Sequence, residues 1–210
     1  MRNLENALDL TELIEDGMPF YPGDPHPHVS DFKILERDGV NIKSLYLGTH
    51  SGTHVDAPHH FLEAGKTLDQ LDIGSYSGEG VVLDLSGVVE ITQADIPDNI
   101  KGKVVLIYTG TSEKWRQGWD MHDFSYLSLD AAKRLVQLGA RVVGIDSPSV
   151  ESPNPTGDVH RELLSHGVLI IENVSKRIKE LAGKRFFLLC LPLRVRGGDG
   201  APARVIALPE

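Results

Sequence analysis

The feature that most constrains the fold is a set of short, continuous runs of Val, Ile and Leu that recur along the chain. A strand with one face in water alternates apolar and polar residues, whereas most of these runs are apolar throughout, as in strands covered on both faces. Such strands are typical of a sheet that is at least partly parallel. We expect extended segments at Ala7–Leu10, Val29–Leu35, Val40–Leu47, Gly80–Leu85, Lys103–Tyr108, Val142–Ile145, Val168–Ile171, Phe186–Leu191 and Arg204–Ala207.

Helices are fewer, and the clearest is predicted at Leu129–Leu138. Ser128 is a suitable N-cap, Asp130 lies in the first turn, and Gly139 ends the helix. Because this helix lies between two apolar runs, it indicates a βα unit. The predicted fold class is α/β: one domain over residues 1–210 with a central mixed, partly parallel sheet flanked by helices. Shorter helices are expected at Asp158–Ser165, Val174–Leu181 and Thr67–Leu71.

Charge and cysteine content narrow the class of partner. The net charge of −9 argues against nucleic acid and anionic membrane surfaces, which both require basic patches. No apolar run approaches the ~20 residues of a membrane span. The single cysteine, Cys190, lies in an apolar run and can form no internal disulfide. These features favour a buried thiol and a cytoplasmic location.

Four histidines and an aspartate stand within His50-Ser-Gly-Thr-His54-Val-Asp56-Ala-Pro-His59-His60. Imidazole and carboxylate are the ligands that a borderline divalent ion such as Zn²⁺ or Mn²⁺ accepts. Gly52 permits a tight turn that lets His50 and His54 converge. An extended backbone would place His54 and Asp56 on one face. Three ligands that leave coordination positions open are typical of a catalytic metal site.

The alternative is that these histidines cluster by chance in a polar loop. The surrounding sequence argues against this, because a strand-like segment leads in and a loop punctuated by glycine and proline leads out. Catalytic residues often lie on loops held by such scaffolds. Pro58 breaks any strand, so His59 and His60 are expected in that loop.

A second candidate pair is His160 and Glu172. His160 lies in the short helix predicted at 158–165, and Glu172 ends the apolar strand that follows. From these positions the two side chains could reach a shared metal centre. The residues alone leave an alternative open, in which Glu172 caps the next helix at Asn173 and His160 is only solvated.

The chain resembles the metal-dependent cyclase superfamily and, within it, the bacterial kynurenine formamidases (arylformamidases). The resemblance covers nearly the whole sequence and implies the swivelling β/β/α fold of that family. Besides the histidine-rich segment, it rests on Asp16-Gly-Met-Pro-Phe-Tyr-Pro-Gly-Asp24, on Gly144-Ile-Asp-Ser-Pro-Ser-Val150 and on the segment 160–173.

The resemblance assigns metal ligands within these motifs. It implies that His50, His54 and Asp56 hold a first ion. A second ion would be served by His160 and Glu172, with Asp56 and Glu172 able to bridge the two. The cofactors implied are therefore two divalent ions, Zn or Mn. A homodimer or a higher homo-oligomer is implied as well.

Further residues match the proton-transfer group and the substrate pocket of the family. His60 corresponds to the proton donor and acceptor, whereas His59 stands at a position that is usually apolar. Phe20 and Tyr21 correspond to pocket walls. Formamidases of this type carry Trp where this chain has Tyr21, and a Tyr presents a smaller ring and adds a hydroxyl. The departure concerns the substrate more than the superfamily.

The reaction implied is metal-dependent hydrolysis of a small amide. N-formylkynurenine, cleaved to kynurenine and formate in tryptophan degradation, is the leading substrate. In such chemistry a metal pair lowers the pKa of a bound water from ~15.7 toward ~7, and the resulting hydroxide attacks the carbonyl carbon. A proton delivered by His60 then lets the amine leave.

Three other interpretations stay open. The superfamily includes hydrolases of cyclic amides such as isatin, and a lactam or lactone is an alternative substrate. The first three ligands could instead form a mononuclear Fe(II) site for O₂ chemistry, although the second pair favours two hydrolytic metals. A non-catalytic metal-binding module would have no need of His60. A serine hydrolase is disfavoured, because the sequence has no Gly-x-Ser-x-Gly motif.

Overall fold

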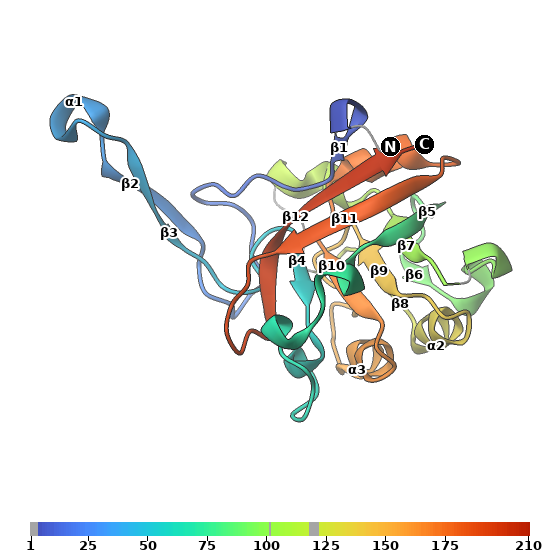
Figure 1. Ribbon diagram of the computed structural model, residues 1–210. Coiled ribbons are helices and arrows are strands. Elements are labelled where there is room, and N and C mark those ends of the chain that lie inside the picture. The colour runs from blue at the N-terminus through green and yellow to red at the C-terminus, as the bar shows by residue number, and fades with distance from the viewer. Residues whose placement is uncertain (1–3, 101, 118–121) are drawn as a thin grey trace.

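Eight strands form one sheet that closes on itself in the computed structural model, which describes residues 4–100, 102–117 and 122–210. The strand order is β1-β12-β11-β5-β7-β9-β10-β4, and β4 also pairs with β12, which closes a barrel (Figure 1). The neighbours among β5, β7, β9 and β10 are parallel, and the other pairs are antiparallel. The expectation of a mixed, partly parallel sheet is confirmed. The strands are β1 (Leu8–Asp9), β4 (His54–Asp56), β5 (Gly78–Asp84), β7 (Val104–Tyr108), β9 (Val142–Ile145), β10 (Leu169–Glu172), β11 (Phe186–Pro192) and β12 (Gly200–Pro209).

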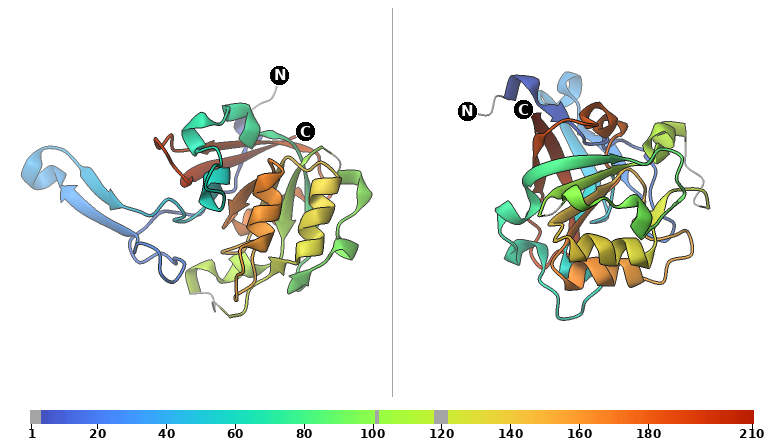
Figure 2. Two further views of the ribbon diagram at one scale, coloured as in Figure 1. Left: turned by 90° about the horizontal axis from the view of Figure 1, so that it is seen from below. Right: turned by 90° about the vertical axis from the view of Figure 1, so that its right-hand side faces the viewer.

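The two longest helices, α2 (Leu129–Gln137) and α3 (Asp158–Ser165), lie side by side against one outer side of the barrel (Figure 2). The predicted cap is present, because the Ser128 hydroxyl accepts the N–H of Ala131. The expectation of a sheet flanked by helices is only loosely right. The inner face of the closed sheet encloses a core instead of meeting a second helical layer. Within the described part of the chain, every helix is too short or too polar to span a bilayer.

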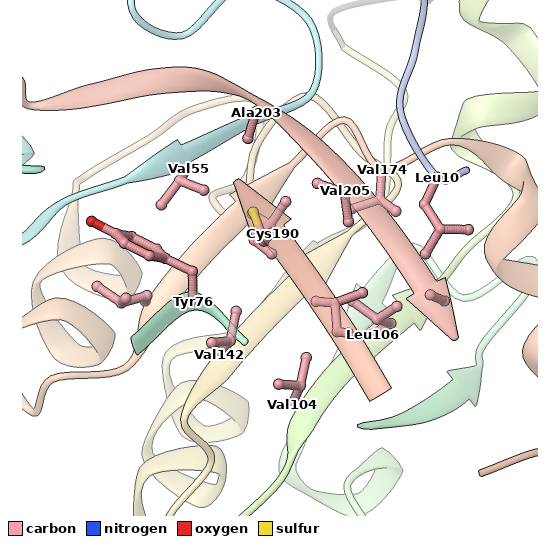
Figure 3. Packing of buried hydrophobic residues seen from close by; sticks show 14 of the residues in the cluster. Leu10, Val55, Tyr76, Val104, Leu106, Val142, Val174, Cys190, Ala203 and Val205 are labelled. Carbon is pink, nitrogen blue, oxygen red and sulfur yellow. The ribbon is translucent and has the colours of Figure 1, made fainter. Parts of the chain in front are cut away.

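The continuous apolar runs are explained by burial on both sides of the barrel wall. In β7, Val104 and Leu106 point into the barrel, whereas Val105 and Ile107 pack in the cluster that contains the helices. Figure 3 shows the inner cluster, where Cys190 lies among aliphatic side chains from several strands. Cys190 is fully buried, as the sequence predicts.

Some expected elements differ in length or geometry. The segment Val174–Leu181 is not an α-helix, and only Lys176–Leu181 forms a 3₁₀ helix. Asn173 adopts a left-handed φ of 55°, and the N–H of Ser175 donates to the carbonyl oxygen of Leu10, so the chain cannot begin an α-helix at Val174. Strand β12 begins earlier than expected. The other 3₁₀ segments are Leu4–Asn6, Pro58–His60, Leu68–Gln70, Ile73–Tyr76, Gln93–Asp95, Asp98–Ile100 and Thr111–Gln117, and the short strands β6 (Glu90–Ile91) and β8 (Tyr126–Leu127) form a separate parallel pair.

A long hairpin projects away from the barrel (Figure 1). It consists of β2 (His28–Lys33), the single helical turn α1 (Leu35–Asp38) and β3 (Ile42–Tyr46). We call residues 28–46 the arm. Its strands exist as predicted, and all five residues of β3 are exposed.

Candidate metal centre

Two antiparallel strands bring the predicted ligands together. Strand β4 carries His54 and Asp56, and Glu172 ends the neighbouring strand β10 directly opposite His54 in the register. Strand β12 pairs with the other edge of β4, so that the three-residue strand is held on both sides. His160 reaches the same point from the first turn of α3. The extended backbone that the sequence argument required at 54–56 is therefore present.

His50 joins this group through a tight turn. Gly52 adopts a φ of 64°, which favours glycine over residues with a Cβ atom. The turn brings the rings of His50 and His54 to a centroid separation of 4.9 Å. The predicted convergence of these two histidines is therefore present in the structure.

The five side chains form two overlapping groups that share Asp56. In the first group, Asp56 Oδ1 lies 2.9 Å from His50 Nδ1 and 3.3 Å from His54 Nε2. In the second, His160 Nε2 lies 3.5 Å from Asp56 Oδ2 and 3.3 Å from Glu172 Oε1. Both carboxylates and His160 are almost fully buried, so the alternative of a solvated His160 is wrong.

The protein surrounds these histidines with negative charge. Burial alone would lower the pKa of His54, but its contacts with Asp56 and Glu172 raise it to about 10. Burial likewise opposes protonation of His50, whose contacts with Asp199 and Asp56 raise its pKa to about 9. Burial would raise the pKa of Asp56, yet the three histidines hold it well below its usual range. Such a site favours bound positive charge, and a divalent ion would replace the imidazole protons.

The hydrogen bonding of the ring nitrogens supplies a test of the fit. His54 Nε2 and Asp56 Oδ2 are buried with no hydrogen-bond partner among the residues that the structure describes. Nδ1 of the same His54 ring lies 2.8 Å from the carbonyl oxygen of Gly52. A metal-bound histidine characteristically donates its outer N–H to an oxygen in this way. Unpartnered polar atoms facing inward and an oxygen acceptor outside fit a divalent ion.

His60 lies beside this cluster. Its ring stacks on that of His50 with a centroid separation of 3.9 Å, and its Nδ1 is 3.5 Å from Asp199 Oδ2. His59 is exposed, as expected of a residue without a role in the site. Both follow Pro58 in a 3₁₀ turn rather than in a strand.

A cavity of about 200 Å³ opens above the cluster. Phe20 and Tyr21 form part of its wall, together with His60 and Phe61. Phe61, which no sequence motif marked, stacks its ring on that of His160 with a centroid separation of 4.3 Å. The cavity brings the predicted wall residues Phe20 and Tyr21 and predicted ligands such as His54 around one space.

Sequence comparison adds the family. Residues 8–152 match the family model described as "Putative cyclase". The chain is 31% identical over 206 residues to the kynurenine formamidase of Bacillus cereus (strain ATCC 10987 / NRS 248), covering 96% of this chain and 97% of that protein. The chain belongs to the cyclase family. A kynurenine formamidase of Erythrobacter litoralis (strain HTCC2594) is 31% identical, with coverage of 94% and 91%.

Solved structures of similar proteins share this fold. A potential metal-dependent hydrolase with cyclase activity superimposes with a TM-score of 0.82 at 33% identity, covering 96% of both chains. An isatin hydrolase bound to a product analogue gives a TM-score of 0.86 at 20% identity, covering 98% of this chain and 93% of that one. The second likeness shows a shared fold.

Two carboxylates near the cluster, those of Glu151 and Asp199, lie outside the motifs recognised in the sequence. Glu151 Oε1 accepts the N–H groups of Val159 and His160, at 2.7 and 3.2 Å, and lies 3.5 Å from His160 Nδ1. Asp199 lies on the loop before β12. The sequence around Asp199 is Gly-Gly-Asp-Gly, and a glycine-rich turn of this kind allows the backbone to approach a site closely. A single carboxylate in such a turn could have indicated a residue of the site.

Proposed function

We propose that this protein is a metal-dependent amidohydrolase that converts N-formylkynurenine to kynurenine and formate. The observation that carries the proposal is the pair of overlapping ligand groups centred on the buried Asp56 at the base of a cavity. Curated kynurenine formamidases that align over nearly the whole chain support this substrate. The formamidase names of these relatives support hydrolysis of an amide. The small cavity is consistent with a compact substrate.

We further propose that the site holds two divalent ions, zinc or manganese. His50, His54 and Asp56 would hold one ion, and His160 and Glu172 the other, with the carboxylates of Asp56 and Glu172 able to bridge. Such ions acidify water at neutral pH and stabilise negative charge that develops on a carbonyl oxygen. The two groups that share Asp56 support two ions rather than one.

His60 is assigned the proton transfer. Its ring lies on the cavity wall, and its Nδ1 faces Asp199, which leaves Nε2 as the nitrogen available to a substrate. An amine leaves poorly as an anion, so a proton must reach the scissile nitrogen as the C–N bond breaks. An imidazole can both accept a proton and return it, which suits His60 to this role.

Phe20 and Tyr21 are assigned to substrate binding. Burial, followed by the negative charge of Glu172, raises the pKa of Tyr21. The phenol therefore remains protonated at neutral pH and can donate a hydrogen bond into the cavity. Its ring offers a surface on which an aromatic substrate could stack.

Replacing Tyr21 tests this assignment. Loss of a stacking contact worth about 0.5–1.5 kcal/mol should lower kcat/KM of Tyr21→Ala by about 2- to 13-fold, with metal content unchanged. Tyr21→Trp should hold or improve turnover of N-formylkynurenine, and Tyr21→Phe separates the hydroxyl from the ring. An unchanged kcat/KM in Tyr21→Ala would remove this residue from the pocket.

The decisive assay uses protein reconstituted with zinc or manganese under strictly anaerobic conditions. Hydrolysis of N-formylkynurenine without oxygen supports the proposal and argues against an Fe(II) oxygenase. Isatin and simple lactams belong in the same screen. No formamidase activity at full metal loading would refute this substrate. Cleavage of a cyclic amide instead would assign a cyclic amide as the substrate of the same site.

We also propose a cytoplasmic homodimer in which the arm packs on a second copy. The arm exposes Phe32, Leu35 and Leu45 at 62%, 60% and 59% of their surface. At its base lies an apolar groove that includes Leu191 and Leu193 of the barrel. A two-stranded ribbon buries little of its own surface, whereas a two-fold exchange would cover arm and groove twice. The buried free thiol of Cys190 is consistent with a reducing compartment.

Charge introduced into the arm should break this dimer. Each buried Phe or Leu side chain contributes about 1.5–3 kcal/mol, so Phe32→Glu combined with Leu35→Glu should raise the dimer Kd by more than about 10²-fold. Light scattering after size exclusion measures the mass. Ile73→Glu is the matched control, because Ile73 is 69% exposed and lies outside the arm. A dimer insensitive to the arm variant, or a monomeric wild type, would contradict the proposal.

A further inference from the structure

A single carboxylate oxygen contacts both histidines on the outer side of the candidate centre. Asp199 Oδ2 lies 3.0 Å from His50 Nε2 and 3.5 Å from His60 Nδ1. The two rings stack with an interplanar angle of 29°. The other nitrogen of His50 faces Asp56 at 2.9 Å. His50 therefore stands between the cluster and Asp199.

The loop that carries Asp199 is built for this approach. The carbonyl oxygen of Asp199 accepts the N–H of Ala57, and that of Gly198 accepts the N–H of Leu68, both at 2.8 Å. A Cβ atom at Gly200 would lie 2.8 Å from His50 Cε1 and 2.7 Å from the carbonyl oxygen of Val55. Only glycine therefore lets the backbone come this close. These main-chain hydrogen bonds fix the backbone of Asp199, so the position of its carboxylate does not depend on the histidine contacts alone.

We propose that Asp199 is a positioning residue that fixes the ring orientation of both His50 and His60. The inference rests on the proposed function, in which these histidines are a ligand and the proton carrier. By accepting the Nε2–H of His50, the carboxylate leaves Nδ1 to face the cluster. By accepting the Nδ1–H of His60, it leaves Nε2 unprotonated on the substrate side. One residue thus sets the tautomers of two neighbouring rings.

The first test measures metal affinity by competition with a chromophoric chelator. Asp199→Ala should weaken zinc binding by about 10- to 100-fold while saturating zinc still fills the same number of sites. Asp199→Asn keeps the shape and one acceptor oxygen, so its affinity should lie between those of wild type and Asp199→Ala. If Asp199→Ala lost one whole zinc equivalent at saturation, Asp199 would be a ligand. If its zinc affinity were unchanged, Asp199 would not orient His50. Either result overturns the proposal.

Asp69→Asn is the matched control. Asp69 Oδ1 accepts the N–H of Gly197 at 3.0 Å, so it anchors the same loop without contacting a histidine. The substitution removes the same charge, and zinc affinity should stay within about twofold of the wild type. A loss equal to that of Asp199→Ala would assign the effect to loop structure and overturn the positioning role.

The second test reads the His60 ring directly. Long-range ¹H–¹⁵N spectra of the zinc-loaded protein report which ring nitrogen carries the proton, and His60→Gln assigns the signal. The wild type should show the Nδ1–H form, and Asp199→Ala should shift toward a mixture of tautomers. At saturating zinc, kcat of Asp199→Ala should stay about tenfold or more below that of the wild type. An unchanged His60 tautomer in Asp199→Ala, or full recovery of its kcat with zinc, would show that Asp199 does not orient His60.

These readouts separate the two proposals. Zinc affinity and ring tautomers need no substrate. A wild type that fails to cleave N-formylkynurenine, yet shows both effects on substitution of Asp199, would refute the proposed substrate and leave the positioning role in place.

Discussion

Replacing His54 with alanine should remove at least one bound metal ion and lower kcat/KM by more than about 10³-fold. The side chain is almost fully buried, and its Nε2 lies 3.3 Å from both Asp56 Oδ1 and Glu172 Oε2. Without this imidazole the first ligand group keeps only two members. The acidification of water from a pKa of ~15.7 toward ~7, on which the proposed hydrolysis depends, would be lost with the ion.

The same substitution should also destabilise the metal-free protein. Asp56 and Glu172 are buried carboxylates, and His54 is one of the cations that offset their charge. Removing one partner of a buried ion pair typically costs about 3–5 kcal/mol of unfolding free energy. Metal analysis, the anaerobic amidase assay and denaturant unfolding with and without chelator measure the three effects. His59→Ala is the control, since His59 is exposed. Full metal content and activity in His54→Ala would refute the site.

The sequence predicts the barrel wall well and its closure poorly. Runs such as 104–108 and 142–145 are strands within a residue of their expected bounds, because burial on both faces leaves an unmistakable apolar pattern. Closure depends on β4, which is three residues long and carries His54 and Asp56 instead of an apolar pattern. It also depends on the first residues of β12, which lie before the expected strand Arg204–Ala207 and include Pro202. Pro202 still accepts the N–H of Leu193 through its carbonyl oxygen.

The arm is a different case. Its strands are predicted but their burial is not, because polar residues such as Asp31 and Lys43 stand among the apolar ones, and the side chains lie on the surface of the single chain. Local pattern cannot distinguish a face covered by the same chain from one that would be covered by another. That distinction depends on tertiary and quaternary contacts, which lie outside the sequence window that defines a strand.

The candidate site divides along similar lines. Ligands within one segment follow from spacing, since Gly52 and an extended backbone bring His50, His54 and Asp56 together. The structure also brings His160 and Glu172 there, as the family resemblance implied. Residues that act from outside the ligand groups are harder to predict. Asp199 lies 149 positions from the His50 ring that it contacts, and no periodicity links the two.

His60→Ala should keep both the fold and the metal ions while kcat falls by about 10²–10⁴-fold, the usual contribution of a positioned acid or base. The His60 side chain is 28% exposed on the cavity wall and stacks on His50 from outside the two groups centred on Asp56. Its loss therefore removes a proton carrier and leaves those groups complete. Metal analysis and kcat at saturating metal are the measurements. His59→Leu is the neighbouring control and should be mild.

The leaving group supplies a sharper test of the same role. An amine needs a proton as the C–N bond breaks, whereas a phenolate from an activated aryl formate ester leaves without one. The deficit of His60→Ala should therefore be large for the amide and much smaller for the ester. In the wild type the His60 ring meets the Phe61 ring edge-on, with a centroid separation of 4.5 Å. Added imidazole should restore part of the amide activity of His60→Ala by entering the space beside Phe61 that His60 leaves empty. Equal deficits for amide and ester would show that His60 does not protonate the leaving amine, and loss of metal from the variant would show that His60 is a ligand.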